Sequence, residues 1–189
     1  MEPAIKLRKF TVQEYDRMVE VGILTKDDKV ELMDGEIVYK PTKSPRHAAC
    51  RSKLVRSLLL FEGKSPQEYD VGTNHPIRLD DYSEVEPDVV IIARDHERFS
   101  REHPKVEDTF LLIEVTDLDP ERNQRLKLPL YARTGVREMW IVDFPNDVIE
   151  VYREPSSEGF KRKTTLRRGD AISPYLFPDI VLSVDEILL

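Results

Sequence analysis

Two carboxylates and one lysine in this sequence have the residue types and spacing of a metal-dependent phosphodiesterase site. Asp88 comes directly before the apolar run 89–93, and Glu114 lies inside the apolar run 110–115. A carboxylate within such a run is costly unless it is paired, protonated or bound to a metal. On adjacent strands, the two carboxylates would suit Mg²⁺ or Mn²⁺, because Mg²⁺ prefers oxygen ligands and keeps several waters.

Lys127 lies on the helix that is predicted to follow the strand of Glu114. A bound metal can polarise a phosphate and acidify a water, and a lysine can orient that water or neutralise developing charge. These residues indicate phosphodiester hydrolysis, with Asp88 and Glu114 as metal ligands and Lys127 positioning the nucleophile. Two simpler interpretations stay open: Asp88 as a turn residue at a strand start, and Lys127 as a solvated helix lysine. Asp143 is interpreted as a cap of the turn that follows it.

Local signals place other elements around these strands. A capping-box pattern that starts at Thr11 predicts a helix over 11–24. Asp34 and Gly35, between two short alternating runs, predict a β-hairpin within 29–39.

A second helix is predicted over about 45–61 by apolar residues at helical spacing. In this prediction Ala49, Leu54, Leu58 and Phe61 face the core, and the basic residues between them face outward.

Apolar runs predict the strands of a central sheet. The runs 89–93, 110–115 and 138–143 are continuous, which is typical of buried strands. Weaker signals predict strands at 67–72, 75–80, 148–153 and 160–166, and a helix over 119–135. Pro129 predicts a kink or a late start in that helix, and residues 94–108 are expected to be irregular. This order predicts an α/β protein with a central mixed β-sheet flanked by α-helices.

Composition limits the class of protein. The 189 residues, with a formal net charge of −7, predict one domain over 1–189. Its parts are an N-terminal helix and hairpin at 8–40, a core at 45–145, and C-terminal strands and a tail at 146–189. The acidic balance argues against a protein that coats nucleic acid by charge alone. No apolar run approaches the ~18–20 residues of a membrane span, and Cys50 is the single cysteine, so we expect a cytoplasmic protein without a membrane partner.

Five motifs make the sequence recognisable. They are Glu31-Leu-Met-Asp-Gly35, Glu86-Pro-Asp-Val89, Leu112-Ile-Glu-Val115, Lys127-Leu-Pro-Leu-Tyr-Ala-Arg-Thr-Gly-Val136 and Glu138-Met-Trp-Ile-Val-Asp143. In this order they resemble the Uma-two family of bacterial restriction-endonuclease-like proteins, within the PD-(D/E)XK nuclease superfamily. The resemblance implies the restriction-endonuclease-like fold and a metal site of Asp88 and Glu114. It also implies that Glu31 contributes from the first hairpin and supports the metal or a bound water; otherwise Glu31 is an exposed hairpin charge.

The position of the lysine separates this family from the wider superfamily. In the superfamily's usual motif the lysine lies two residues after the second carboxylate, where this sequence has Thr116. The Uma-like pattern moves the lysine to the next helix, and Lys127 matches that place. The family commonly has an aspartate one helical turn before this lysine, where this sequence has Asn123, and on an α-helix the two residues would share a face.

Several residues are candidates for contact with nucleic acid. His47, at the start of the second helix, resembles a family position and is predicted to contact a phosphate or water; the alternative is a structural histidine. Arg125 and Asn123 lie on the proposed site helix and are predicted to meet the substrate. The basic segment 161–168 would either grip phosphates or protect a sheet edge.

These observations together predict a Mg²⁺-dependent nuclease that hydrolyses DNA, with Mn²⁺ as the other candidate metal. A homodimer is expected, because two sites related by a two-fold axis can address both strands. Asn123 and the acidic charge favour the alternative, a catalytically inactive nucleic-acid-binding or protein-interaction module on the same fold. A third interpretation, a protein that only dimerises, predicts that Glu114 is buried and paired to a basic residue.

Overall fold

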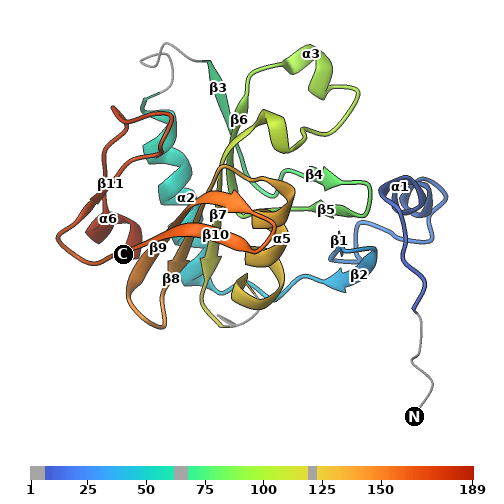
Figure 1. Ribbon diagram of the computed structural model, residues 1–189, viewed down its shortest axis with the longest axis horizontal. Helices are drawn as coiled ribbons and strands as arrows, with labels where there is room; N and C mark the ends of the chain where they lie inside the picture. Colours follow the sequence, from blue (N-terminus) through green and yellow to red (C-terminus); the bar gives the residue numbers. More distant parts are fainter. Residues whose placement is uncertain (1–6, 62–67, 119–122) are drawn as a thin grey trace.

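The centre of the protein is a six-stranded mixed β-sheet (Figure 1). The computed structural model describes residues 7–61, 68–118 and 123–189. In spatial order the sheet contains β10 (Gly159–Leu166), β9 (Val148–Ser156), β8 (Glu138–Asp143), β7 (Thr109–Thr116), β6 (Val89–Ala93) and β3 (Tyr69–Gly72). Strands β7 and β8 are parallel, and the other neighbours are antiparallel. The predicted mixed sheet and its three apolar strands are therefore confirmed.

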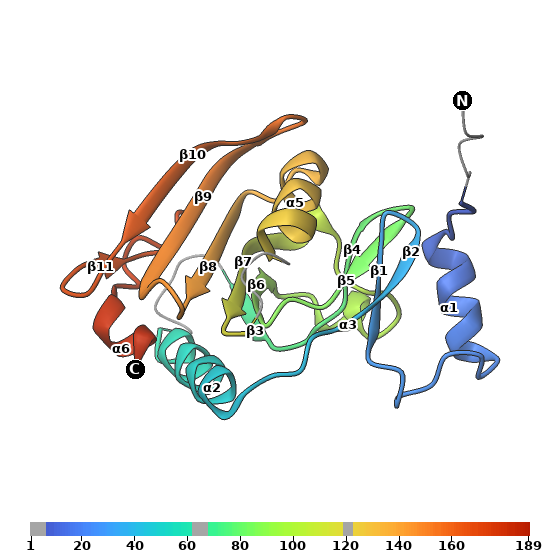
Figure 2. The same ribbon diagram turned by 90° about the horizontal axis from the view of Figure 1, so that it is seen from below.

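Two helices cover opposite faces of this sheet, as Figure 2 shows: α2 (Pro45–Leu59) and α5 (Leu128–Thr134). Helix α2 begins at the Ser44 cap and buries His47, Cys50, Leu54 and Leu58 along one face. Ala49 is exposed, so its predicted place in the core is wrong. The buried face starts at a histidine, which a search for apolar residues does not select.

Alternation along the strands divides the core in two. Val89 and Ile113 pack on the α2 side, whereas Val90 and Leu112 pack on the α5 side with Tyr131. Side chains two residues apart on a strand share a face. Glu114 therefore continues the face that α5 covers, and it contacts Tyr131 of α5 there.

A second, four-stranded sheet lies beside the first. Its order is β2 (Glu36–Tyr39), β1 (Val30–Met33), β5 (Ser83–Val85) and β4 (Ile77–Asp80). Helix α1 (Val12–Glu20) precedes it and starts with the predicted capping box at Thr11. Strand β5 is not predicted from the sequence, because it is three residues long and has no apolar run. Strand β5 pairs with β1, so β1 is an inner strand of this sheet, and all four residues of β1 are buried.

The remaining elements are short: α3 (His96–Phe99), the 3₁₀ turn η1 (Val106–Asp108), the π-helix η2 (Asn123–Lys127), β11 (Ala171–Ile172), β12 (Leu182–Ser183) and α6 (Val184–Leu188). Helix α6 packs against α2, so the C-terminal tail joins the core. None of the helices in the described part of the chain has the length and apolar character needed to span a bilayer.

The segment before α5 differs from the predicted helix over 119–135. Its first residues lie outside the described ranges; the described part begins as the π-helix Asn123–Lys127, and α5 starts at Leu128. Pro129 stands in the first turn of α5, where proline is tolerated, and the change from π-helix to α-helix falls at Leu128, next to it.

The hairpin turn leads to a first prediction, on stability. Gly35 has φ +73°, and an added Cβ would lie 2.7 Å from Lys9 Cβ and 3.0 Å from the backbone of Phe10. Gly35→Ala is therefore expected to lower the free energy of unfolding by about 2–3 kcal/mol in urea denaturation. Gly22 has a similar φ of +77° but open space around it, so Gly22→Ala should cost only about 1 kcal/mol. Equal losses in the two variants would contradict the steric part of this argument.

Candidate active site

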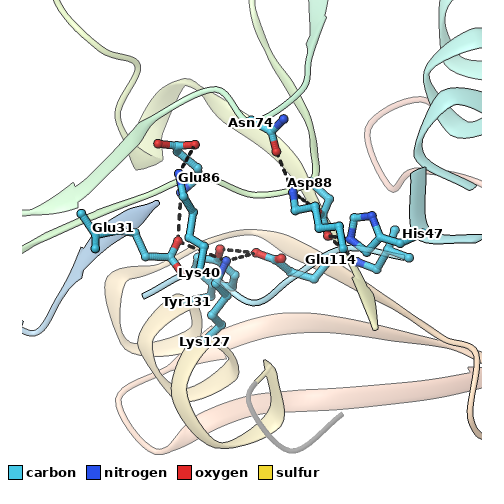
Figure 3. Close-up of polar contacts among 12 residues, drawn as sticks. Glu31, Lys40, His47, Asn74, Glu86, Asp88, Glu114, Lys127 and Tyr131 are labelled. Atoms are coloured by element: carbon cyan, nitrogen blue, oxygen red, sulfur yellow. Dashed lines mark hydrogen bonds and ion pairs between the residues drawn. The ribbon is translucent and has the colours of Figure 1, made fainter. Parts of the chain in front are cut away.

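Strand register brings the two predicted carboxylates together. In the antiparallel pair β6–β7, Val89 lies opposite Ile113 and Val90 opposite Leu112. One further step of the same register places Asp88 opposite Glu114. The backbone N–H of Val115 donates to Asp88 Oδ2 at 2.9 Å, which holds the Asp88 side chain beside this end of β7. Both side chains lie in the close-up of Figure 3.

Asp88 is buried and strongly bonded. Its Oδ2 accepts from Val115 N–H and lies 2.9 Å from His47 Nε2, and its Oδ1 lies 2.6 Å from Lys43 Nζ. Burial raises the pKa of Asp88, but the His47 hydrogen bond and the Lys43 charge outweigh it and hold that pKa well below the usual range. Asp88 is therefore an anion at neutral pH, as a metal ligand must be.

Glu114 has the opposite electrostatic character. Its Oε1 accepts from Lys127 Nζ at 2.9 Å and from the Tyr131 hydroxyl at 2.7 Å. Burial, together with the nearby charges of Asp88 and Glu31, raises the pKa of Glu114 to about 7, although Lys127 and the Tyr131 hydrogen bond oppose this. Glu114 therefore exchanges its proton near neutral pH, and a bound cation would favour the ionised form.

Lys127 is buried between two carboxylates. Its Nζ lies 2.9 Å from Glu114 Oε1 and 3.3 Å from Glu31 Oε2. Burial lowers the pKa of Lys127, but Glu114 and Glu31 outweigh that effect and raise it above the ordinary lysine value. The simpler interpretation of Lys127 as a solvated lysine is wrong. Glu114 is thus buried and paired to a basic residue, as the hypothesis of a protein that only dimerises predicts. This basic residue is Lys127, which the nuclease hypothesis also places at the site, so the pairing does not separate the two hypotheses.

Glu31 reaches the same place from the other sheet. It lies on β1, is 1% exposed, and accepts a hydrogen bond from the Glu86 backbone N–H at 3.2 Å. Its interpretation as an exposed hairpin charge is therefore wrong. The Glu31 side chain points at Lys127, and Glu31 Oε2 lies 3.3 Å from Lys127 Nζ (Figure 3).

The other candidates occupy different positions. His47 is buried and contacts Asp88, so its ring supports a site residue; its contact with nucleic acid stays a prediction. Arg125 is exposed on η2. Asn123 begins this segment, which is a π-helix with hydrogen bonds from i to i+5 and not the predicted α-helix. Asp143 accepts from the backbone and side-chain N–H groups of Asn146, which confirms its interpretation as a turn cap.

These side chains line a pocket of about 50 Å³, which is room for an ion and a few waters. Its charged residues are Glu31, Lys40, Lys43, Glu86, Asp88, Glu114, Asp117 and Lys127. With every carboxyl ionised and His47 neutral, five carboxylates face three ammonium groups. This leaves two negative charges in excess, which a divalent cation would balance.

The donor set fits a partly hydrated cation. In the described part of the chain, no three His, Cys, Asp or Glu side chains converge as metal ligands. Mg²⁺ is commonly held by one or two carboxylates and several waters. Asp88 and Glu114 supply that number of carboxylates, so the residues present fit Mg²⁺ or Mn²⁺ better than a metal enclosed by protein ligands.

Three further residues of the site are not assigned a role by the sequence. Tyr131 lies one helical turn after Lys127, and this spacing is the signal that could have found it. Glu86 lies two residues before Asp88 and lines the same pocket. Lys43 lies in a proline-containing loop, where nothing in the sequence distinguishes it from other exposed lysines.

Two carboxylates on neighbouring strands of a mixed sheet, with a lysine from the next helix, define a nuclease-like protein. The family model Uma2, described as "Putative restriction endonuclease", matches residues 12–185. The chain therefore belongs to the Uma2 family, which is the family that its motifs resemble.

A solved structure has the same fold. The crystal structure of "a putative nuclease belonging to DUF820 from Anabaena variabilis ATCC 29413" matches with a TM-score of 0.72 and 16% sequence identity. The match covers 95% of this chain and 97% of that one, so the likeness extends over the whole fold. Among curated proteins, none matches this chain.

Proposed function

We propose that this protein is a Mg²⁺-dependent nuclease that hydrolyses phosphodiester bonds in DNA, with Mn²⁺ as an alternative metal. The observation that carries the proposal is that Asp88, Glu114, Glu31 and Lys127 line one pocket, where β6 and β7 lie side by side. Membership of the Uma2 family supports a nuclease-like activity. DNA as the substrate, a homodimeric state and a cytoplasmic location are parts of the same proposal.

Each residue has a role that its contacts support. Asp88 and Glu114 would hold the metal, which when bound polarises a phosphate and activates a water. His47 and the Val115 N–H orient Asp88, and the Tyr131 hydroxyl orients Glu114.

Lys127 and Glu31 are buried residues that line the inner side of the pocket, here called its inner wall. The Lys127 ammonium can position the attacking water or stabilise charge that develops on the phosphate. Glu31 supports Lys127 through their ion pair and can accept a hydrogen bond from a bound water. Arg125, Asn123 and His47 are proposed to contact the nucleic acid around this wall.

The alternative is a nucleic-acid-binding or protein-interaction module without turnover. One observation favours it: Lys127 already neutralises Glu114 without any metal. This alternative predicts salt-dependent binding of DNA that is indifferent to Mg²⁺.

Calorimetric titration with Mg²⁺ and Mn²⁺ tests the proposal without a guess at the substrate sequence. Saturable binding is expected for the wild type and is expected to disappear in Glu114→Gln. Glutamine keeps the size of the side chain and can still accept from Tyr131 and Lys127, so the change removes mainly the charge.

Glu150→Gln is a matched control. Glu150 is also a buried carboxylate that bonds one tyrosine, Tyr152, and one lysine, Lys163, each at 2.6 Å, but it lies on β9 outside the pocket. This variant should bind the metal like the wild type. If the wild type binds neither metal, with or without a DNA oligonucleotide, the module without turnover becomes the better account.

A further inference from the structure

Lys43 forms an ion pair with one of the two carboxylate oxygens of Asp88. Its Nζ lies 2.6 Å from Asp88 Oδ1 and 2.8 Å from Asn74 Oδ1. The other oxygen, Oδ2, is held by His47 and by the Val115 N–H. Within the described ranges, Lys43 is the single polar partner of Oδ1. A cation that binds Asp88 without breaking the buried hydrogen bonds of Oδ2 must therefore approach Oδ1.

Lys43 differs from the buried lysine of the site. The side chain of Lys43 is 30% exposed, whereas Lys127 and Asp88 are each 6% exposed. The Lys43 ammonium thus reaches Asp88 from the open side of the pocket. A lysine stem is flexible, and its charge is strongly hydrated. Lys43 can therefore leave Asp88 by rotation of its side chain, without a change in the core.

The backbone around Lys43 is anchored on both sides. Lys40 pairs with Glu86 at 2.7 Å, and Glu86 lines the same pocket. Ser44 caps α2 by accepting from His47 N–H and also bonds Asp117. These contacts keep the Lys43 backbone at the pocket mouth, so a displaced ammonium stays close to the site.

We propose that Lys43 is a further functional residue of this site: it is the counter-ion of Asp88 in the metal-free protein, it competes with the divalent cation for Oδ1, and once displaced it binds a phosphate of the nucleic acid. The proposal rests on the proposed function. Two cations at one oxygen repel each other, so metal binding and the Lys43–Asp88 contact oppose each other. An ammonium at the mouth of an acidic pocket is also the group that a phosphate would meet first.

In Lys43→Met, the affinity for Mn²⁺ and the affinity for DNA are expected to change in opposite directions. Mn²⁺ affinity, measured by calorimetry or by the loss of the free-ion electron paramagnetic resonance signal, is expected to rise roughly tenfold, because one competing charge is removed. Affinity for a DNA duplex in Ca²⁺, measured by fluorescence anisotropy, is expected to fall, and its salt dependence to weaken by about one phosphate contact. Lys43→Arg keeps the charge and should lie near the wild type in both measurements.

Lys163→Met is the matched control, because Lys163 also pairs with a carboxylate at 2.6 Å but outside the pocket. It should leave Mn²⁺ affinity unchanged. A merely structural Lys43 would lower both affinities or neither, and either result would overturn the proposal. If the wild type binds Mn²⁺ and Glu114→Gln does not, the metal site stands whatever Lys43→Met shows. If the wild type binds no metal, both proposals fail.

Discussion

Cleavage of DNA in the presence of Mg²⁺ is expected to fall at least about a thousandfold in Glu114→Gln, because a metal contributes several kcal/mol to such a reaction and ~1.4 kcal/mol corresponds to a factor of ten. The variant removes one of two carboxylates from the proposed metal site and leaves the Tyr131 and Lys127 contacts available. The measurement is single-turnover cleavage of supercoiled plasmid and of linear duplex at saturating protein.

Two comparisons make this result interpretable. Glu150→Gln, with its equivalent tyrosine and lysine partners on β9, is expected to cleave within about twofold of the wild type, as for other changes away from the site. Addition of EDTA to the wild type should reproduce the loss. Cleavage that survives in Glu114→Gln at a tenth of the wild-type rate or more would place the reaction outside this pocket.

The two carboxylates can be selected from the sequence because each lies next to or inside an apolar run that predicts a buried strand. Glu114 stands in a run of apolar residues, so its burial follows from the pattern of the strand. The register that sets Asp88 opposite Glu114 does not follow from the sequence, since β6 and β7 are joined by a long connection and shift register near Ile91. The sequence therefore indicates the two candidate carboxylates, and the fold shows that they line the same pocket.

Burial of Glu31 depends on an element without a sequence signal. The sequence predicts β1 as half of a hairpin, but in the fold β5 pairs with its other edge, so β1 is an inner strand, and all four of its residues are buried. Strand β5 carries Glu84 and has only three residues, so neither periodicity nor hydrophobicity reveals it. Long-range pairing, rather than local preference, makes Glu31 a partner of Lys127.

The contacts of the loop that carries Lys43 also depend on long-range interactions that the sequence does not reveal. Prolines and a serine correctly predict a loop between β2 and α2. The contact of Lys43 with Asp88 depends on where that loop crosses the pocket, and this depends on the Ser44 cap and on the pairing of Lys40 with Glu86. Composition alone makes Lys43 one basic residue among many.

Removal of the buried ammonium is expected to have the largest effect on stability. Lys127→Met leaves Glu114 and Glu31 buried without their shared cation, and breaking a buried pair in this way typically costs about 3–5 kcal/mol. The free energy of unfolding of the metal-free variant, measured with urea at about pH 8, should therefore fall by that amount relative to the wild type.

The pH dependence separates this charge effect from lost packing. The pKa of Glu114 in the folded protein, about 7, lies above its ordinary value of 4.5, so the folded state binds more protons in this window. The contribution of Glu114 to stability is therefore complete below about pH 4.5 and is lost as the pH rises through 7. Lys127→Met raises that pKa further, so its cost should be larger at about pH 8 than at about pH 5.

Lys161, exposed on β10, provides the control: Lys161→Met should change stability by less than about 0.5 kcal/mol at either pH. Mg²⁺ should restore part of the loss in Lys127→Met at the higher pH, because a ligand that binds only the folded state stabilises it. Equal losses at both pH values, with no effect of Mg²⁺, would mean that Lys127 contributes by packing, and the electrostatic account of the pocket would then be wrong.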